Sequence, residues 1–265
     1  EQQLNGFSTG VIFKGTYTPK YVIKYSIEEN KNESVEYANL EKEDQYFYTT
    51  KVTTTQSTQD DDGSTGTTTK TVLYADLKSL LVGSFSDDVN GDIVKLLFGG
   101  AGSTTTTVTK EEVEAVVNTL QGKFGEAYAA FVGKNIQESV NISDINYEAF
   151  AQTIKPNDAE VLAEKYDIHY YKDGTCYYKY WIRHANNGLN PPDNPNLGIM
   201  EYGIVRNNLY KLDVTAIKKL GDPLPFTPGV DDPKNPNEDD KTQYYITVMV
   251  YVKDWVIRDN GQIEL

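Results

Sequence analysis

The hydrophobic period of this chain changes twice along its length, which limits the folds that it can adopt. Near the start, residues 10–17 and 21–25 are short runs of β-formers bounded by Gly and Pro. From about residue 75 to residue 166 apolar residues recur every three or four positions, and after Asp167 alternating runs return. The sequence therefore predicts an α+β fold that is mainly β, with a helical insertion over residues 75–166.

The clearest helix start in the insertion is a capping box formed by Thr109 and Glu112. In such a box the Thr hydroxyl accepts from the third backbone N–H, and the Glu reaches back to the Thr backbone. We expect Ser143 to cap a second helix and Pro156 to begin a third. Behind Thr109, one helix face carries Val113, Val116, Val117, Leu120, Phe124 and Phe131. This apolar stripe indicates core packing.

Strand patterns follow the insertion. Residues 168–171 and 176–183, joined by Asp173-Gly174, predict a hairpin. Further strands are predicted over residues 198–205, 209–214 and 244–252. The strand at 198–205 is expected to share one core with the strand near the N-terminus, so that residues 1–265 form a single domain.

Two polar tracts interrupt the strands. Residues 49–71 contain eleven Thr around a centre of turn-forming residues. This tract suits an extended hairpin or a loop, and we expect a loop with short strands beside it. Residues 228–240 hold three Pro and five carboxylates against one Lys, the composition of an exposed connector.

Charge and motif content argue against several classes of function. A formal net charge of −14 opposes binding to nucleic acid or to an anionic membrane. No apolar stretch reaches the roughly 18 residues that a membrane span needs. The common nucleotide-binding, zinc-protease and nucleophile-elbow motifs are absent, and the histidines are His169 and His184 alone. We therefore expect no enzyme activity and no cofactor.

The single cysteine and one acidic run are candidate chemical sites. Cys176 is either a small buried strand residue, which we favour, or a nucleophile paired with His184. The run from Asp87 to Asp92 resembles a calcium loop, but its oxygen donors do not alternate and no Glu follows at the twelfth position. We expect a turn there and no metal site.

The most specific pattern lies within residues 177–225. It consists of Tyr180-Trp181-Ile182-Arg183-His184, Gly198-Ile199-Met200-Glu201, Ile204-Val205-Arg206-Asn207-Asn208 and Leu220-Gly221-Asp222-Pro223. Together with Val252-Lys253-Asp254-Trp255 and the strand at residues 10–15, this pattern resembles the C-terminal domain of the Bacteroidales fimbrillins. The resemblance is to the major subunit of their short (minor) fimbriae in particular. It does not extend to the helical insertion.

The resemblance implies a transthyretin-like β-sandwich, one of two in each structural subunit of a surface fimbria. It implies export through the outer membrane as a lipoprotein, removal of an N-terminal segment by an arginine-specific protease, and polymerisation by strand exchange. The implied partners are other copies of the subunit, fimbrial anchor and tip proteins, and host or bacterial surface ligands in adhesion, biofilm formation and virulence. The lipobox cysteine and the first sandwich are expected to precede Glu1.

The C-terminal tail has the pattern of a strand that joins subunits. Residues 244–252 are largely apolar on both faces, as in a strand inside a sandwich. Beyond Asp254 the tail carries the apolar residues Trp255, Val256, Ile257, Ile263 and Leu265. An added strand binds by backbone pairing, with alternate side chains in pockets. We therefore predict that residues 255–265 are donated to the next subunit.

Two alternatives stay open from the sequence. The tail can instead complete the sheet of its own subunit. The chain can also be a fimbrial tip adhesin or a carbohydrate-binding module, since its twenty tyrosines suit stacking on sugars. The apolar tail favours the polymer subunit, because a tip protein is expected to lack a donor strand.

Overall fold

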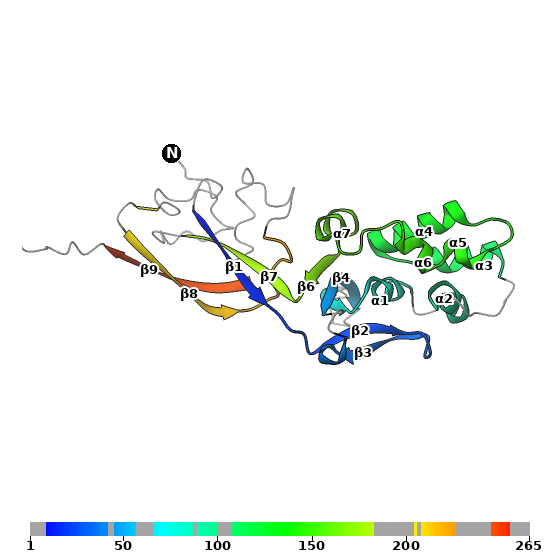
Figure 1. The fold of residues 1–265 in the computed structure, drawn as a ribbon, viewed down its shortest axis with the longest axis horizontal. Helices are drawn as coiled ribbons and strands as arrows, with labels where there is room; N and C mark the ends of the chain where they lie inside the picture. Colours follow the sequence, from blue (N-terminus) through cyan, green and yellow to red (C-terminus); the bar gives the residue numbers. More distant parts are fainter. Residues whose placement is uncertain are drawn as a thin grey trace, which may run out of the picture. The chain divides into compact units, whose positions relative to one another are not determined.

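The computed structural model describes residues 9–41, 45–56, 66–86, 89–99, 108–182, 204–205, 208–225 and 245–254. Contacts within the chain divide it into two compact units. The first unit holds Glu1–Gly15 and Cys176–Leu265, and the second holds Thr16–Thr175. Most of the elements drawn in Figure 1 belong to the second unit.

The second unit is built on a five-stranded mixed sheet. Its strands are β2 (Tyr21–Ser26), β3 (Lys31–Glu36), β4 (Tyr46–Gln56), β5 (Gly66–Tyr74) and β6 (His169–Lys172), in the order β3-β2-β5-β4-β6. Neighbouring strands are antiparallel except β2 and β5, which pair in parallel through Ile23 and Tyr74. The sheet therefore joins segments from both ends of this unit.

The α-helices of the described residues all lie between β5 and β6 in the sequence. They are α1 (Leu77–Val82), α2 (Gly91–Phe98), α3 (Lys110–Val117), α4 (Gly122–Asn135), α5 (Ile142–Ile145), α6 (Tyr147–Ala151) and α7 (Ala159–Tyr166). With the strands they confirm the predicted α+β class. The transthyretin-like form stays a prediction, as does a single domain with residues 11–17 and 198–205 in one core, because residues 198–203 lie outside the described part.

The capping box at the start of α3 is confirmed. The Thr109 Oγ1 accepts from the Glu112 N–H at 3.2 Å, and the Thr109 N–H donates to Glu112 Oε2 at 2.9 Å. These two bonds satisfy backbone donors that a helix start otherwise leaves unpaired. The hydrogen bonds from Thr109 also hold the pKa of the Glu112 carboxyl below its ordinary value.

The other two predicted helix starts are wrong. Ser143 lies inside the short helix α5, and Pro156 lies two residues before the N-cap of α7. The residues that cap α6 and α7 are Asn146 and Asp158, whose side chains accept from the backbone N–H three residues on. Asn and Asp are among the strongest N-cap residues. The change of hydrophobic period had placed these helices within residues 75–166, but their caps are other polar residues nearby.

One apolar core fills the space between the helices and one face of the sheet. It contains buried residues from four strands and from most helices, among them Tyr25, Tyr48, Tyr74, Leu81, Phe98, Val113, Phe124, Leu162 and Tyr170. Tyr128 of α4 lies at its centre, with ring centroids 5.4 Å from Phe98 and 5.2 Å from Phe150. Its hydroxyl donates to the Ile145 carbonyl at 2.8 Å. This buried polar atom is therefore satisfied, and burial raises the pKa of Tyr128.

The opposite face of the sheet carries a smaller aromatic cluster. Phe47 of β4 stacks on Tyr171 of β6 with 4.8 Å between ring centroids. Tyr17 and Tyr37 meet the same Phe47 ring edge to face, each at 6.1 Å. Phe47 and Tyr171 alternate along their strands with residues of the helical core. Both faces of the β4–β6 pair are therefore buried by aromatic side chains.

This aromatic packing accounts for a strand pairing that the sequence did not predict. The expected hairpin between residues 168–171 and 176–183 is wrong, because β6 pairs with β4 from Tyr46↔Lys172 to Thr49↔His169. The following strand, β7 (Thr175–Trp181), pairs instead with β1 (Gly10–Thr16). Asp173 and Gly174 do form the expected tight bend, with φ of 51° and 63°. The bend sends the chain into another sheet rather than back along β6.

The threonine-rich tract forms longer strands than expected. β4 and β5 pair without interruption from Tyr48↔Tyr74 to Gln56↔Gly66. Thr is β-branched and favoured in strands, so the same composition that resembles a loop also supports a ladder. Residues 57–65, which hold the turn-forming centre, lie outside the described part.

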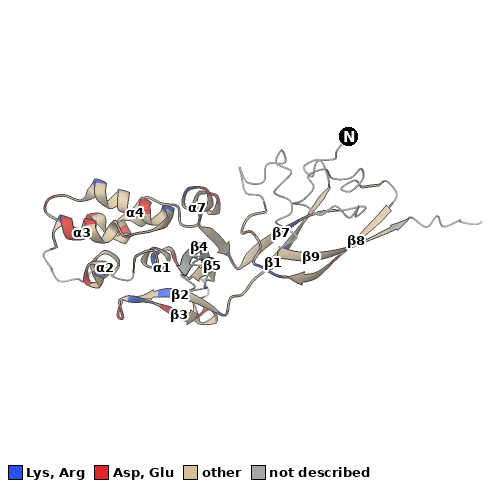
Figure 2. Ribbon diagram, turned by 180° about the vertical axis from the view of Figure 1, so that it is seen from behind, with Lys and Arg blue, Asp and Glu red and all other residues tan. Residues whose placement is uncertain are grey.

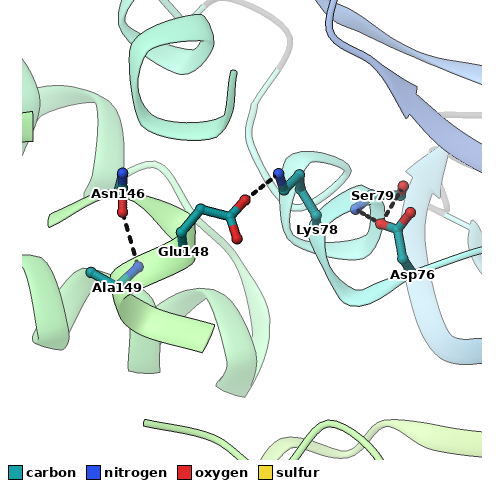
Figure 3. Close-up of polar contacts among 6 residues, drawn as sticks. All are labelled: Asp76, Lys78, Ser79, Asn146, Glu148 and Ala149. Carbon is teal, nitrogen blue, oxygen red and sulfur yellow. Dashed lines mark hydrogen bonds and ion pairs between the residues drawn. The ribbon is translucent and has the colours of Figure 1, made fainter. Parts of the chain in front are cut away.

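Helix α1 is tied to α6 by an ion pair. Asp76 caps α1 and accepts from both the N–H and the hydroxyl of Ser79 at 2.7 Å. Lys78, two residues on, places its Nζ 2.6 Å from Glu148 Oε1 on α6 (Figure 3). The same Nζ lies 5.2 Å from the ring centroid of Tyr147. Because the Glu148 side chain is 57 % exposed, we expect the pair to contribute no more than about 1 kcal/mol.

The close approach of Gly83 to the sheet gives a stability prediction. A Cβ at Gly83 would lie 2.7 Å from the Tyr74 hydroxyl and 3.2 Å from Asn32 Nδ2. Tyr74 is buried in the core and cannot move aside freely. We expect Gly83→Ala to lower the free energy of unfolding by about 1–3 kcal/mol, measured by urea denaturation.

The matched control is Gly133→Ala, because Gly133 lies on α4 with open space around the site of its Cβ. This change should raise the free energy of unfolding by about 0.5–1 kcal/mol, since Ala is the better helix former. A Gly83→Ala protein as stable as the wild type would contradict the packing of α1 against β5.

Candidate subunit interface

The described strands of the first unit form two separate pairs. β1 pairs with β7, and β8 (Asn208–Ile217) pairs antiparallel with β9 (Ile246–Asp254). A two-stranded ribbon alone is at best marginally stable in water, so it needs a surface to pack against. The apolar or polar character of each face of the β8–β9 ribbon therefore indicates which face packs against another surface.

One face of the β8–β9 ribbon is apolar along its length, apart from the end pair of Asn208 and Asp254. Partners directly opposite each other share a face, and alternate pairs share the same face. A bulge at Thr215, between Val214 and Ala216, adds one residue to β8. Ile217 therefore lies on the same face as Val214, although the two are three positions apart. The apolar face, as we call it, comprises Tyr210, Leu212, Val214, Ile217, Ile246, Val248, Val250 and Val252.

The apolar face is partly open to solvent. Ile217 is 63 % exposed, Val214 41 % and Val252 37 %, whereas Ile246 is buried. The opposite face is mixed: Lys211 lies 3.0 Å from the Asp213 carboxylate and 5.5 Å from the Tyr251 ring centroid. Burial of the apolar face therefore stabilises the protein more than burial of the mixed face.

Residues 219–222 begin with a bend at Lys219 and lie against β7, and we call this segment the turn at Gly221. The Tyr177 N–H donates to the Asp222 carbonyl at 2.8 Å, and the Asp222 N–H donates back to the Tyr177 carbonyl at 2.9 Å. The Tyr178 hydroxyl donates to the Lys219 carbonyl at 3.2 Å. Gly221 lies against this strand so closely that a Cβ would be 2.5 Å from the Tyr177 carbonyl oxygen. The quoted segment around Gly221 is thus bonded to Tyr177 and Tyr178 of β7, the strand that continues into the quoted segment around Tyr180.

Cys176 lies beside this turn as a buried residue. Its side chain is 2 % exposed, and its Sγ lies 3.7 Å from the Tyr178 hydroxyl. Burial, followed by the hydrogen bond with Cys176, raises the pKa of Tyr178 to about 12. Cys176 is therefore placed as expected for a small buried strand residue, while His184 lies outside the described part.

The predicted donor residues also lie outside the described part. These are Trp255, Val256, Ile257, Ile263 and Leu265. β9 ends at Asp254, so the tail continues directly from a strand of the ribbon. The sequence had identified the apolar pattern of β9, but not the apolar residues of β8 that face the same way. Their spacing of two, from Tyr210 through Leu212 to Val214, is the signal that would have found them.

Neither metal ligation nor a membrane span is indicated where the chain is described. Within that part, no three His, Cys, Asp or Glu side chains gather as they would around a metal ion. None of its helices has the length and apolar character needed to cross a membrane. At the predicted turn of residues 87–92, Asn90 caps α2 by accepting from the Asp92 N–H at 3.1 Å, while Asp87 and Asp88 lie outside the description.

Comparison with known proteins gives one match. Residues 169–261 match the family described as "Major fimbrial subunit protein type IV, Fimbrillin, C-terminal". No curated protein and no solved structure matches the chain significantly. The matched range includes β7, the turn at Gly221 and both strands of the β8–β9 ribbon.

The turn at Gly221 provides a test of the packing in the first unit. We expect Gly221→Ala to lower the free energy of unfolding by about 1–3 kcal/mol, because the added methyl would meet the Tyr177 carbonyl and the Tyr178 ring. Thermal unfolding followed by near-UV circular dichroism measures this effect. Gly15→Ala is the control, since its Cβ would make only ordinary contacts of 3.6 Å with Cys176 and Tyr178. Equal melting temperatures for the two variants would show that the turn does not pack as described.

Proposed function

We propose, from the fimbrillin C-terminal domain that residues 169–261 carry, that this chain is a structural subunit of a bacterial surface fimbria. It joins the next copy of the same chain through residues 255–265, and the apolar face of the β8–β9 ribbon forms part of the joining surface. The fimbrillins are structural proteins, so the chain acts by assembly and not by catalysis. Export through the outer membrane and a role in adhesion and biofilm formation belong to this proposal.

The observation that carries the proposal is the apolar face of the β8–β9 ribbon. Eight apolar residues share this face, and Ile217, Val214 and Val252 remain more than a third exposed. An exposed apolar patch of this kind on a protein surface marks an interaction site. The matched family is one whose members assemble, so a second copy of the chain is the partner that fits.

The tail supplies the second part of the joining surface. It follows β9 without a break and adds apolar residues, beginning with Trp255, Val256 and Ile257. Each such side chain contributes about 1.5–3 kcal/mol when fully buried. Ordering a free tail costs about 1–2 kcal/mol per residue. Backbone hydrogen bonds to the neighbour must therefore accompany the side-chain burial, as they do when a strand is added to a sheet.

A fimbrial tip adhesin or a carbohydrate-binding module is the rival proposal. Twenty tyrosines motivate it, but those of the second unit's sheet, such as Tyr48, Tyr74 and Tyr171, are buried in packing. Aromatic rings that bind sugars must be accessible. Size-exclusion chromatography of the full chain separates the two proposals, since a ladder of oligomers supports the polymer subunit and an unchanging monomer supports the rival.

The tail can be tested by deletion of residues 255–265. The shortened chain should stay folded, with a free energy of unfolding within about 0.5 kcal/mol of the wild type, while fibres are lost from cells. Ile257→Asp with Ile263→Asp should act in the same way, because an unpaired charge in an apolar pocket is costly. Ile257→Val with Ile263→Val is the matched control and should retain fibres. Fibres of normal length from the deleted chain would show that the joining strand lies elsewhere.

The apolar face is tested by two matched substitutions on β8. Ile217→Asp changes an apolar-face residue that is 63 % exposed, and Leu209→Asp changes one on the mixed face that is 57 % exposed. Both variants should unfold within about 0.5 kcal/mol of the wild type as monomers, because both sites are open to water. Only Ile217→Asp should prevent oligomers in size-exclusion chromatography. Equal assembly of the two variants would show that the apolar face is not part of the joining surface.

A further inference from the structure

The strands β1 and β7 mark the place where the chain leaves the first unit and returns to it. The Ile182 N–H, just after β7, donates to the carbonyl of Thr9, just before β1, at 3.0 Å. At the other end of the pair, Gly15 lies beside Cys176 and Tyr178. The two strands therefore run antiparallel, as in a hairpin, but the connection between them is the whole of the second unit.

The two ends of the second unit meet each other. Tyr17 and Gly174 each lie one residue inside an end of the unit. The Tyr17 N–H donates to the Gly174 carbonyl at 2.8 Å. An insertion whose ends are adjacent can replace a turn without separating the strands that flank it, which is why domains with neighbouring termini are tolerated as insertions. The connection thus has the geometry of an inserted domain.

The second unit also has a complete core of its own. Every buried residue of the main core, from Tyr25 to Tyr170, belongs to Thr16–Thr175. The aromatic cluster on the other face of the sheet, with Phe47 and Tyr171, belongs to the same unit. A chain of about 160 residues buries roughly 70 % of the surface that it exposes when unfolded, which is enough for independent stability.

The family match falls on the other unit. It begins at residue 169 and overlaps the second unit only over β6 and the bend that follows it. The rest of the matched range, including the β8–β9 ribbon and the Gly221 turn, lies in the first unit. The residues on which the proposed function depends are thus separate in sequence from the core of the second unit.

We infer that Thr16–Thr175 is an independently folding domain inserted into the fimbrillin-like part, displayed on the fibre without taking part in the joining of subunits. This rests on the proposed function only for the fibre itself. The insertion is larger than the helical one expected from the sequence, because it brings its own sheet.

Calorimetry of the full chain tests the inference with core variants from each unit. Wild-type protein should show two unfolding transitions. Leu162→Ala removes a fully buried side chain of the second unit and should lower one transition by roughly 5–15 °C. Ile182→Ala removes a buried side chain of the first unit and should lower only the other transition. Val132→Ala, a smaller truncation in α4, replaces Leu162→Ala if that variant does not fold. A single transition that all variants shift would overturn the independent domain.

Polymerised samples test the second half of the inference. Assembly should raise the midpoint temperature of only one transition, the one that Ile182→Ala lowers, because a partner stabilises the part of the chain that it binds. If polymerisation raises the midpoint temperature of the transition that Leu162→Ala lowers, the second unit takes part in joining. The display role is then overturned. If the wild type forms no polymers, the proposed function fails, while the calorimetry of the monomer still decides whether the domain is independent.

Discussion

The hydrogen bond between the Tyr17 N–H and the Gly174 carbonyl is the constraint on which the arrangement of the second unit depends. Gly174 has a φ of 63°, and a Cβ there would overlap the Tyr17 carbonyl, so only glycine satisfies both the conformation and the approach. The bond holds the two ends of the unit together, one residue inside each. With its ends fixed in this way, β6 can complete the same sheet that β2 begins, although all the described α-helices lie between them in the sequence.

The two units bury their apolar residues in different ways. In the second unit the helices cover one face of the sheet and the Phe47 cluster covers part of the other, so strands such as β4 have buried residues on both sides. In the first unit one face of the β8–β9 ribbon carries eight apolar residues and remains partly open to solvent. Exposed apolar side chains grouped on one face are typical of interaction surfaces, and this difference between the units is the basis of the proposed joining surface.

Much of this organisation could be predicted from the sequence, and the exceptions have physical causes. The period change placed the helices within residues 75–166, and the Thr109 capping box was found in full because it depends on two residues three positions apart. The pairing of β6 with β4 could not be found in this way. It depends on Phe47 stacking on Tyr171, a contact between residues far apart in sequence, and the local turn signal at Asp173-Gly174 suited either outcome. The apolar face was half predicted: the pattern of β9 was identified, whereas the spacing of two in β8, from Tyr210 to Val214, was present in the sequence but was not connected with it before the register was known.

The edges of the strands also differ between the units in a way that bears on assembly. β3 is an edge strand of the five-stranded sheet, and its sequence KNESVE places charged residues along that edge. Lys31 lies 3.5 Å from both Glu29 and Glu33. Charged side chains on an edge oppose pairing with another chain. β9, in contrast, has the sequence ITVMVYVKD and is uncharged until its last two residues. Strand addition is therefore discouraged at the β3 edge of the second unit, while the ribbon that leads into the tail carries no such protection along most of β9.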